Sequence, residues 1–121
     1  MMKKRVMVVD DSRVMELQIC KLLEGSKFEV VAYCENGEEA ISRYEEIQPD
    51  IVTMDIIMPG IDGLEAAQVL LEEHPDARIV IVSSLICEET IQDAEAIGAK
   101  TFLYKPVQKE GLLKALEKAM M

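Results

Sequence analysis

Basic residues are scarce in this chain. Its 121 residues include 13 lysines and arginines against 23 aspartates and glutamates, so the formal net charge is −10. A protein that binds nucleic acid through the phosphates needs a basic face. The composition therefore disfavours direct binding to nucleic acid and favours a cation or a cationic partner.

Long apolar runs are also missing. The first run, at residues 6–9, is too short for a signal peptide because Asp10 follows it, and no later run approaches the length of a membrane span. The three cysteines, Cys20, Cys34 and Cys87, lie in apolar surroundings without a C-x-x-C spacing, and we expect reduced thiols in or near the core. These features predict a cytoplasmic protein without membrane insertion.

Glycine-rich phosphate-binding motifs are absent as well. No G-x-G-x-x-G follows the first apolar run, which disfavours a dinucleotide-binding enzyme. A flavodoxin-like binding module would need a phosphate cradle at the same place, where Asp10 and Asp11 would repel the phosphate. We find no linker or low-complexity stretch, and half of the residues are hydrophobic. The sequence therefore predicts one ordered domain, residues 1–121.

Short apolar runs alternate with helical patterns along the chain. Five runs rich in β-branched residues predict strands, at residues 5–9, 28–33, 50–54, 78–82 and 101–104. After each run, apolar residues recur every three or four positions, as on the buried face of a helix. This alternation predicts an α/β fold with a parallel sheet and helices on both faces. The spacing of the runs leaves the order of the strands open.

Acidic, hydroxyl and amine side chains follow four of the predicted strands. Asp10 and Asp11 end the first strand, Asp55 the third, Ser83 and its neighbour Ser84 the fourth, and Lys105 the fifth. In an open α/β sheet, ligands bind beyond the carboxyl ends of the strands. We therefore expect these side chains to form one site.

Three neighbouring carboxylates repel one another. At an effective dielectric constant near 20, one close pair costs roughly 4 kcal/mol. A hard divalent cation with oxygen ligands, Mg²⁺ or Mn²⁺, would offset this repulsion. Lys105 would pair with Asp55, and the Ser83 hydroxyl would donate to an incoming oxygen. Together these groups are the ones needed to transfer a phosphoryl group onto an aspartate.

Single residues near this edge also have structural interpretations. Taken alone, Asp11 and Ser12 fit a role as caps of the first helix as well as they fit a role in the site. Asp50 is expected at the entry of the third strand, away from the site, and His74 at a solvated helix end. The coincidence of compatible groups at four strand ends favours a site over separate structural roles.

Four motifs resemble the receiver domains of two-component response regulators, including the stand-alone CheY-like members. They are "VVDDS" (8–12), "MDIIMPGIDG" (54–63), "VSS" (82–84) and "YKP" (104–106), and they occur in the family's order along nearly the whole chain. The resemblance implies a flavodoxin-like (βα)5 fold with five parallel strands in the order 2-1-3-4-5. It also implies a cis peptide bond before Pro106.

The resemblance assigns a role to each residue of the site. Asp55 is implied as the phosphoacceptor, which takes a phosphoryl group from the phosphohistidine of a sensor kinase. Asp11 is implied as a direct ligand of Mg²⁺ and Asp10 as a ligand through water, with Asp55 and the backbone carbonyl of Ile57 completing the protein ligands. Lys105 would contact a phosphoryl oxygen.

The resemblance also implies a conformational switch. The Ser83 hydroxyl would move onto the phosphoryl group, and the surface of the fourth helix, fifth strand and fifth helix would change. Phe102 occupies the position of an aromatic residue that changes rotamer in this family; a fixed packing role is the alternative. The apolar side chains of Ile57 and Leu85 predict slow loss of the phosphoryl group, because they would shield it from water.

Several partners and alternatives follow from the resemblance. The expected partners are a sensor histidine kinase, a downstream protein and a phosphatase, and the chain would be a monomer or a phosphorylation-dependent dimer. It would catalyse only its own phosphorylation and dephosphorylation. The terminal "KALEKAMM" favours a stand-alone regulator, as in chemotaxis, over a receiver cut from a longer regulator with a DNA-binding or enzymatic output domain. A haloacid-dehalogenase-type phosphatase is disfavoured because Ser12 replaces the second acid of its Asp-x-Asp motif.

Overall fold

The computed structural model describes residues 2–84 and 87–121, in which five strands alternate with five helices. The strands are β1 (Lys4–Val9), β2 (Phe28–Cys34), β3 (Ile51–Met54), β4 (Ile79–Ser83) and β5 (Thr101–Tyr104). The helices are α1 (Arg13–Leu22), α2 (Gly37–Ile47), α3 (Gly63–Glu73), α4 (Glu88–Ile97) and α5 (Lys109–Met120). Within these residues, every helix is too short or too polar to cross a membrane.

The five strands form one parallel sheet in the order β2-β1-β3-β4-β5, which confirms the predicted fold class. The order of the strands reverses at β1, so that β1 lies next to β3 although β2 separates them in the chain. This reversal brings the carboxyl ends of β1 and β3 together, where Asp10 and Asp55 follow the strands. Such a switch point is the usual ligand site of open α/β sheets.

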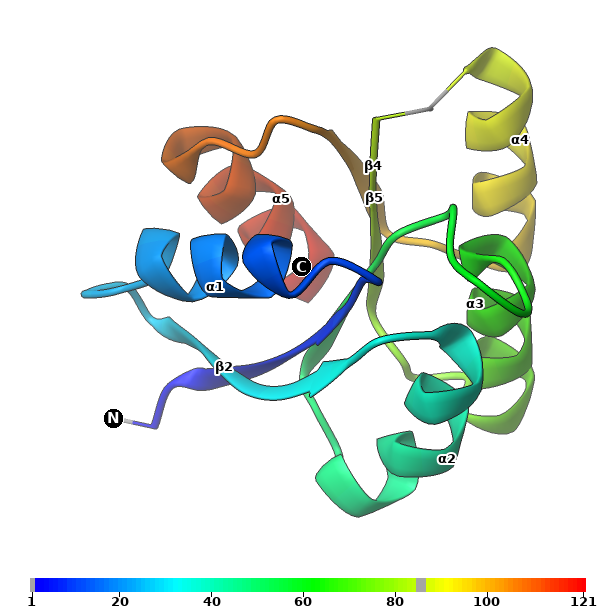
Figure 1. Ribbon diagram of the computed structural model, residues 1–121, viewed down its shortest axis with the longest axis horizontal. Coiled ribbons are helices and arrows are strands. Elements are labelled where there is room, and N and C mark those ends of the chain that lie inside the picture. The colour runs from blue at the N-terminus through cyan, green and yellow to red at the C-terminus, as the bar shows by residue number, and fades with distance from the viewer. Residues whose placement is uncertain (1, 85–86) are drawn as a thin grey trace.

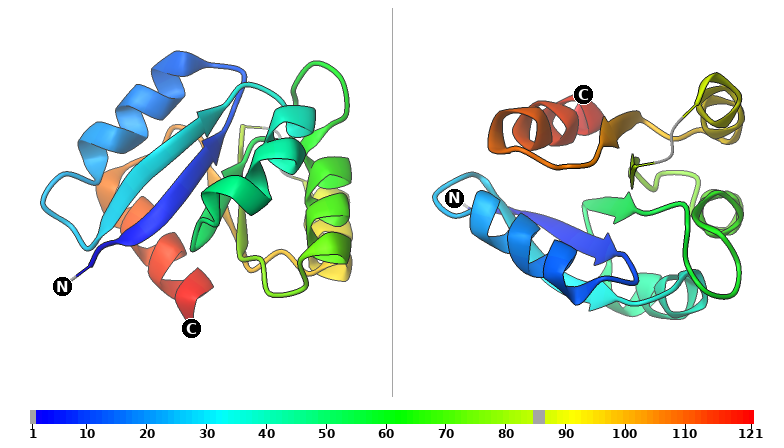
Figure 2. Two further views of the ribbon diagram at one scale, coloured as in Figure 1. Left: turned by 90° about the horizontal axis from the view of Figure 1, so that it is seen from below. Right: turned by 45° about the horizontal axis from the view of Figure 1, so that its top comes forward.

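The helices cover both faces of the sheet. Helices α1 and α5 lie on one face, and α2, α3 and α4 lie on the other (Figure 1; Figure 2). Met7 and Val9 pack toward α2 and α3, whereas Val6 and Val8 pack toward α1 and α5, and each of the four is at most 1% exposed. Because both faces are covered, the central strands β1, β3 and β4 are mainly apolar, with Thr53 and Ser83 as buried polar residues.

Strand β2 changes face halfway along its length. Val6 pairs with Val30 but Met7 pairs with Ala32, so Val31 is the extra residue of a β-bulge. Phe28 consequently packs in the core below α1 and α5, whereas Ala32 packs in the core on the opposite face. In an unbroken strand, residues 28 and 32 would share a face.

Side chains cap two helices near the site. Asn36 Oδ1 accepts a hydrogen bond from the N–H of Glu39 (2.7 Å), and Asp62 Oδ1 accepts one from the N–H of Glu65 (2.9 Å). Ser12 stands at the N-cap position of α1, but its side chain makes no capping hydrogen bond. The interpretation of Ser12 as a side-chain cap is therefore wrong.

The cysteines are all free, and they differ in exposure. Cys34 is buried and Cys20 is half-buried, as predicted. Cys87 is exposed, so the prediction of a core or near-core thiol is wrong at this position. Cys87 precedes the first turn of α4, where its Sγ lies 3.2 Å from the Thr90 hydroxyl instead of facing the sheet. The Lys105–Pro106 peptide bond is cis, as the resemblance implied.

Candidate functional site

Three carboxylates meet at the carboxyl edge of β1 and β3. One oxygen from each of Asp10, Asp11 and Asp55 lies within 4.8 Å of the others. Backbone hydrogen bonds fix two of these residues, from Asp10 N to Cys34 O (3.0 Å) and from Asp55 N to Val9 O (2.9 Å). Asp10 and Asp55 are 2% and 6% exposed, whereas Asp11 faces solvent. We call these three residues the acidic rim.

Lys105 supplies a positive charge to the acidic rim. Its Nζ lies 2.9 Å from Asp10 Oδ2 and 3.4 Å from Asp55 Oδ2. Burial lowers the pKa of the Lys105 ammonium, but its hydrogen bonds and attraction to Asp10 and Asp55 outweigh burial, and the net pKa is raised. Lys105 therefore stays protonated at neutral pH. The sequence predicted its pairing with Asp55 but missed the closer contact with Asp10.

Asp55 is destabilised as an anion. Burial raises the pKa of its carboxyl, and repulsion by Asp10 raises it further, while Lys105 and the Ile56 N–H oppose the change. One lysine thus does not balance the buried carboxylates. A second cation at the acidic rim would restore the balance, and oxygen donors from three carboxylates suit a hard divalent ion. The residues present fit the predicted Mg²⁺ site.

The loop after β3 passes tightly over the phosphoacceptor candidate. The N–H of Gly63 donates to Ile56 O (2.8 Å), and a Cβ at Gly63 would overlap the backbone carbonyl oxygen of Asp55. Only glycine fits this approach. The side chain of Ile57 in the same loop is 53% exposed, so its apolar surface lies open beside the acidic rim.

Ser83 and Phe102 lie on the two adjoining strands. Ser83 ends β4 with 1% exposure, and its carbonyl oxygen accepts a hydrogen bond from the Lys105 N–H (3.1 Å). Phe102 pairs with Ile81 in the sheet and packs, half-buried, against the core on the α2–α4 face. Leu85, the second residue predicted to shield the phosphoryl group, lies outside the described residues.

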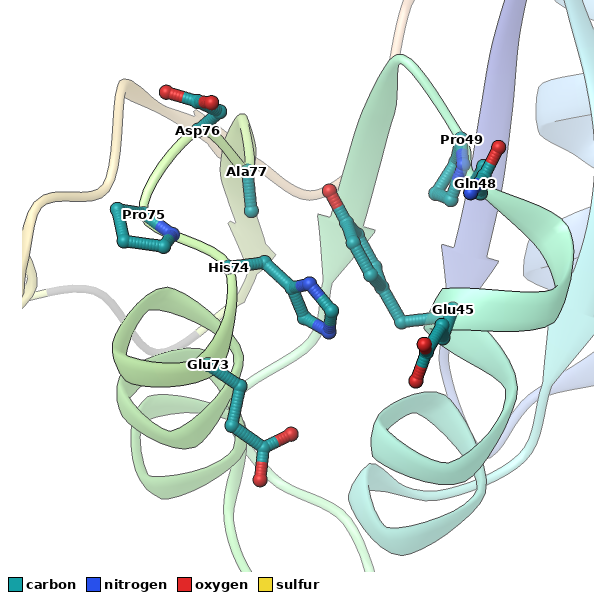
Figure 3. Close-up of a pocket in the computed structure, with 9 residues that line it drawn as sticks. Glu45, Gln48, Pro49, Glu73, His74, Pro75, Asp76 and Ala77 are labelled. Carbon is teal, nitrogen blue, oxygen red and sulfur yellow. The ribbon is translucent and has the colours of Figure 1, made fainter.

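Asp50 and His74 lie at the opposite edge of the sheet. Asp50 Oδ2 accepts a hydrogen bond from the Arg5 N–H (2.7 Å), which confirms its structural role at the entry of β3. His74 is half-buried and stacks on Tyr44 with ring centroids 4.5 Å apart, so the prediction of a solvated residue is wrong. Both rings line a hollow of about 520 Å³ between the ends of α2 and α3 (Figure 3).

Arg13 and Tyr33 form a cation–π contact that no sequence motif predicts. The Arg13 guanidinium lies 5.2 Å from the centroid of the Tyr33 ring, and its Nε pairs with Glu16 Oε1 (2.8 Å). Burial raises the pKa of the Tyr33 hydroxyl, and the charges of Glu35, Asp10 and Asp11 raise it further, while Arg13 opposes them. No sequence pattern predicts this contact, because residues 13 and 33 are 20 positions apart and meet only once α1 packs against β2.

Comparison with known proteins gives a consistent result. The family model for the response regulator receiver domain matches residues 6–117. The chain is 44% identical to the chemotaxis protein CheY of Listeria monocytogenes, over 95% of this chain and 97% of that protein. It is 40% identical to CheY of Bacillus subtilis, over 98% and 99% of the two chains.

A solved structure resembles the fold closely. A chain of the CheX–CheY–BeF3–Mg²⁺ complex from Borrelia burgdorferi aligns with a TM-score of 0.94 and 30% identity, covering 99% of this chain and 91% of that chain. The parallel sheet, its switch point and the acidic rim thus define a receiver domain. The chain belongs to the family of response regulator receiver domains, and it is CheY-like.

Membership of this family establishes the general function. The protein is a phosphorylation-switched component of two-component signalling. CheY-like receiver domains are signalling proteins and are generally not enzymes. Receiver domains bind Mg²⁺ in an acidic pocket. They act together with histidine kinases and output targets.

Proposed function

We propose that Asp55 accepts a phosphoryl group from the phosphohistidine of a sensor histidine kinase. The observation that carries the proposal is the convergence of Asp10, Asp11 and Asp55 within 4.8 Å, with the Lys105 ammonium 3.4 Å from Asp55. One Asp55 carboxylate oxygen would form the bond to phosphorus while the bond from phosphorus to the kinase histidine nitrogen breaks. The histidine leaves with the electron pair of that bond.

We assign the metal to the same three carboxylates. Asp11 would bind Mg²⁺ directly and Asp10 through water, with Asp55 and the carbonyl oxygen of Ile57 as further ligands; Mn²⁺ has the same preference for oxygen. When bound, the ion supplies positive charge that neutralises the phosphoryl oxygens and the carboxylates.

Lys105 and Ser83 would act on the phosphorylated state. The Lys105 ammonium, already held between Asp10 and Asp55, would pair with a phosphoryl oxygen. Ser83 would donate its hydroxyl to another oxygen, and Phe102 would move with it, so that the surface formed by α4, β5 and α5 changes. A fixed packing role for Phe102 remains the alternative.

The cellular partners follow from this chemistry. We propose a histidine kinase as phosphodonor, a downstream protein that reads the surface of α4, β5 and α5, and a phosphatase that ends the signal. The chain would catalyse only its own phosphorylation and dephosphorylation. Similarity to CheY over nearly its full length supports a stand-alone regulator.

Incubation with Mg²⁺ and a small phosphodonor tests the phosphoacceptor assignment. We expect the intact protein to gain the mass of one phosphoryl group, and the Asp55→Asn variant to gain none. Asp50→Asn is the matched control, because Asp50 lies at the opposite edge of the sheet, and this variant should still be labelled. Labelling of Asp55→Asn, or no labelling of the parent protein, would overturn the assignment.

A further inference from the structure

Helices α3 and α4 lie side by side on one face of the sheet (Figure 1; Figure 2). An open groove is lined by side chains of both helices. The groove consists of two adjoining hollows of about 380 and 230 Å³. Three residues line both hollows: Gln68 from α3, and Ala96 and Ile97 from α4. The hollows are therefore two parts of one surface feature, which we call the α3–α4 groove.

The α3–α4 groove is strongly acidic. Helix α3 contains three glutamates and helix α4 contains four acids, and neither helix contains a lysine or an arginine. Four carboxylates line the groove: Asp62, Glu65, Glu72 and Asp93. Among the residues that the structure describes, every ion pair lies outside these two helices. Within the described residues, no lysine or arginine therefore pairs with an acid of the groove.

Aliphatic side chains form the floor of the α3–α4 groove. Leu64, Leu71 and Ile97 are half-buried and pack against the core on this face of the sheet, which holds them in place. Glu65 and Glu72 are exposed and lie two helical turns apart on α3, and Asp93 is exposed on α4. The groove therefore offers an aliphatic strip with acidic margins, formed by Asp62, Glu65 and Glu72 on the α3 side and by Asp93 on the α4 side.

We propose that the α3–α4 groove binds a basic amphipathic helix of a partner protein. A helix laid into a groove places apolar side chains on the floor, and lysines or arginines on either side of that stripe would meet the acidic margins. The charge of the groove repels phosphates, and this excludes nucleic acid and anionic lipid as occupants. The surface differs from the acidic rim, so the inference does not depend on the phosphoacceptor assignment.

A second copy of this chain is a poorer occupant. Three of its lysines, Lys100, Lys114 and Lys118, line one hollow, but the latter two stand on α5, which also carries Glu110 and Glu117. Lys114 is already paired with Glu110 (3.2 Å), and Glu117 with Lys27 (3.8 Å). This surface mixes both signs of charge, so it complements the acidic groove poorly.

Fluorescence anisotropy with a labelled synthetic peptide tests the proposal. The probe is a helix-forming peptide in which lysines flank a stripe of leucine and alanine, and its control is a peptide of the same composition whose order destroys the stripe. We expect the amphipathic peptide to bind at least tenfold more tightly than the scrambled one. Equal binding of both peptides, or no binding of either, would overturn the proposal.

Two variants locate the binding surface. Glu65→Lys combined with Asp93→Lys reverses one exposed charge on each margin, and the capping residue Asp62 is left intact. We expect affinity to fall at least tenfold. Glu45→Lys combined with Glu46→Lys makes the same change in net charge on exposed positions of α2, and should lower affinity much less. An equal loss in both variants would show unspecific attraction and refute the groove.

A third variant separates shape from charge. Ala96 is exposed and lines both hollows, so Ala96→Tyr should fill the groove without altering charge or the core. We expect it to lower the affinity for the amphipathic peptide at least tenfold, as the double charge reversal does. Analytical sedimentation of the protein without peptide tests whether a second copy of the chain occupies the groove. Self-association that the Glu65→Lys and Asp93→Lys changes abolish would assign the groove to a second copy and overturn the proposed partner.

Discussion

Asp55 is a buried carboxylate whose neighbours do not fully compensate its charge. Its pKa is raised, chiefly by burial and then by Asp10. A carboxyl with a raised pKa in the folded state binds its proton more tightly there than in the unfolded chain. The folded state therefore loses stability as the pH rises from the ordinary value of 3.8 through the raised pKa.

Asp55→Asn should consequently stabilise the metal-free protein. We expect the free energy of unfolding at pH 7 to rise by about 1 kcal/mol, because the buried charge and its repulsion with Asp10 are removed. The gain should disappear below about pH 4, where Asp55 is protonated in both states. Urea unfolding at the two pH values measures this difference. Asp76→Asn changes an exposed acid and should have little effect, and a less stable Asp55→Asn protein at pH 7 would contradict the prediction.

Ile57 offers a test of phosphoryl lifetime. Its exposed apolar side chain follows Asp55 by two residues and cannot hydrogen-bond an attacking water. Ile57→Asn adds an amide at this place, and one new hydrogen bond of about 1.4 kcal/mol in the transition state would speed loss of the phosphoryl group roughly tenfold. The decay of phosphorylated protein, followed by intact mass, measures the rate. Val14→Asn, at an exposed position of α1, is the control, and equal rates for Ile57→Asn and the parent would refute the shielding role.

Substitution by alanine should have opposite effects on stability at two glycines near helix starts. A Cβ at Gly63, the first residue of α3, would overlap the Asp55 carbonyl oxygen, whereas a Cβ at Gly111 in α5 would lie 3.5 Å from Leu103 Cδ1, an ordinary contact. Gly63→Ala should destabilise the protein by about 1–3 kcal/mol and slow labelling of Asp55. Gly111→Ala should stabilise it by about 0.5–1 kcal/mol, since alanine favours the helix.

Urea unfolding of the two variants, with labelling by a small phosphodonor, measures both effects. Equal stability of Gly63→Ala and the parent would show that the loop after β3 can move away from Asp55. Such a result would remove the argument that this loop holds the phosphoacceptor in a fixed position.

The strands show which parts of the fold a sequence reveals. Nearly continuous apolar runs predicted β1, β3 and β4, because burial on both faces favours apolar residues at most positions, with Thr53 as the exception in β3. The same reasoning could not locate the bulge at Val31, since Val30 and Val31 are chemically alike and only pairing with β1 decides which one is left out. The order of the strands came from the family resemblance, because local patterns carry no information on which strands pair.

For the candidate site, the sequence predicted which residues come together but not their detailed contacts. Residue type and position at strand ends identified Asp10, Asp55 and Lys105 as neighbours, because parallel strands end at a common edge. Which acid lies closer to Lys105 depends on side-chain rotamers and on burial in the folded protein. Cys87 was misjudged for a related reason, since its apolar sequence neighbours do not determine which way a residue before a helix faces.

Over the whole molecule, two groups of carboxylates differ in how closely they are packed, and they suit different ligands. The acidic rim holds its carboxylates close together and partly buried, which suits a small ion, whereas the α3–α4 groove spreads exposed carboxylates over two helices. Because the protein has a net charge of −10, any added salt reduces the repulsion among its acidic side chains. A specific metal effect must therefore exceed the effect of ionic strength.

Mg²⁺ should stabilise this protein more than NaCl of equal ionic strength does. At a concentration a hundredfold above its dissociation constant, an ion that binds only the folded state adds about 2.7 kcal/mol to the free energy of unfolding. Asp11→Asn provides the decisive variant, because Asp11 is exposed and its loss should leave the metal-free stability nearly unchanged while the Mg²⁺ effect falls. Thermal unfolding with each salt, with and without a chelator, measures the difference. An equal Mg²⁺ effect in Asp11→Asn and the parent would remove Asp11 from the metal ligands.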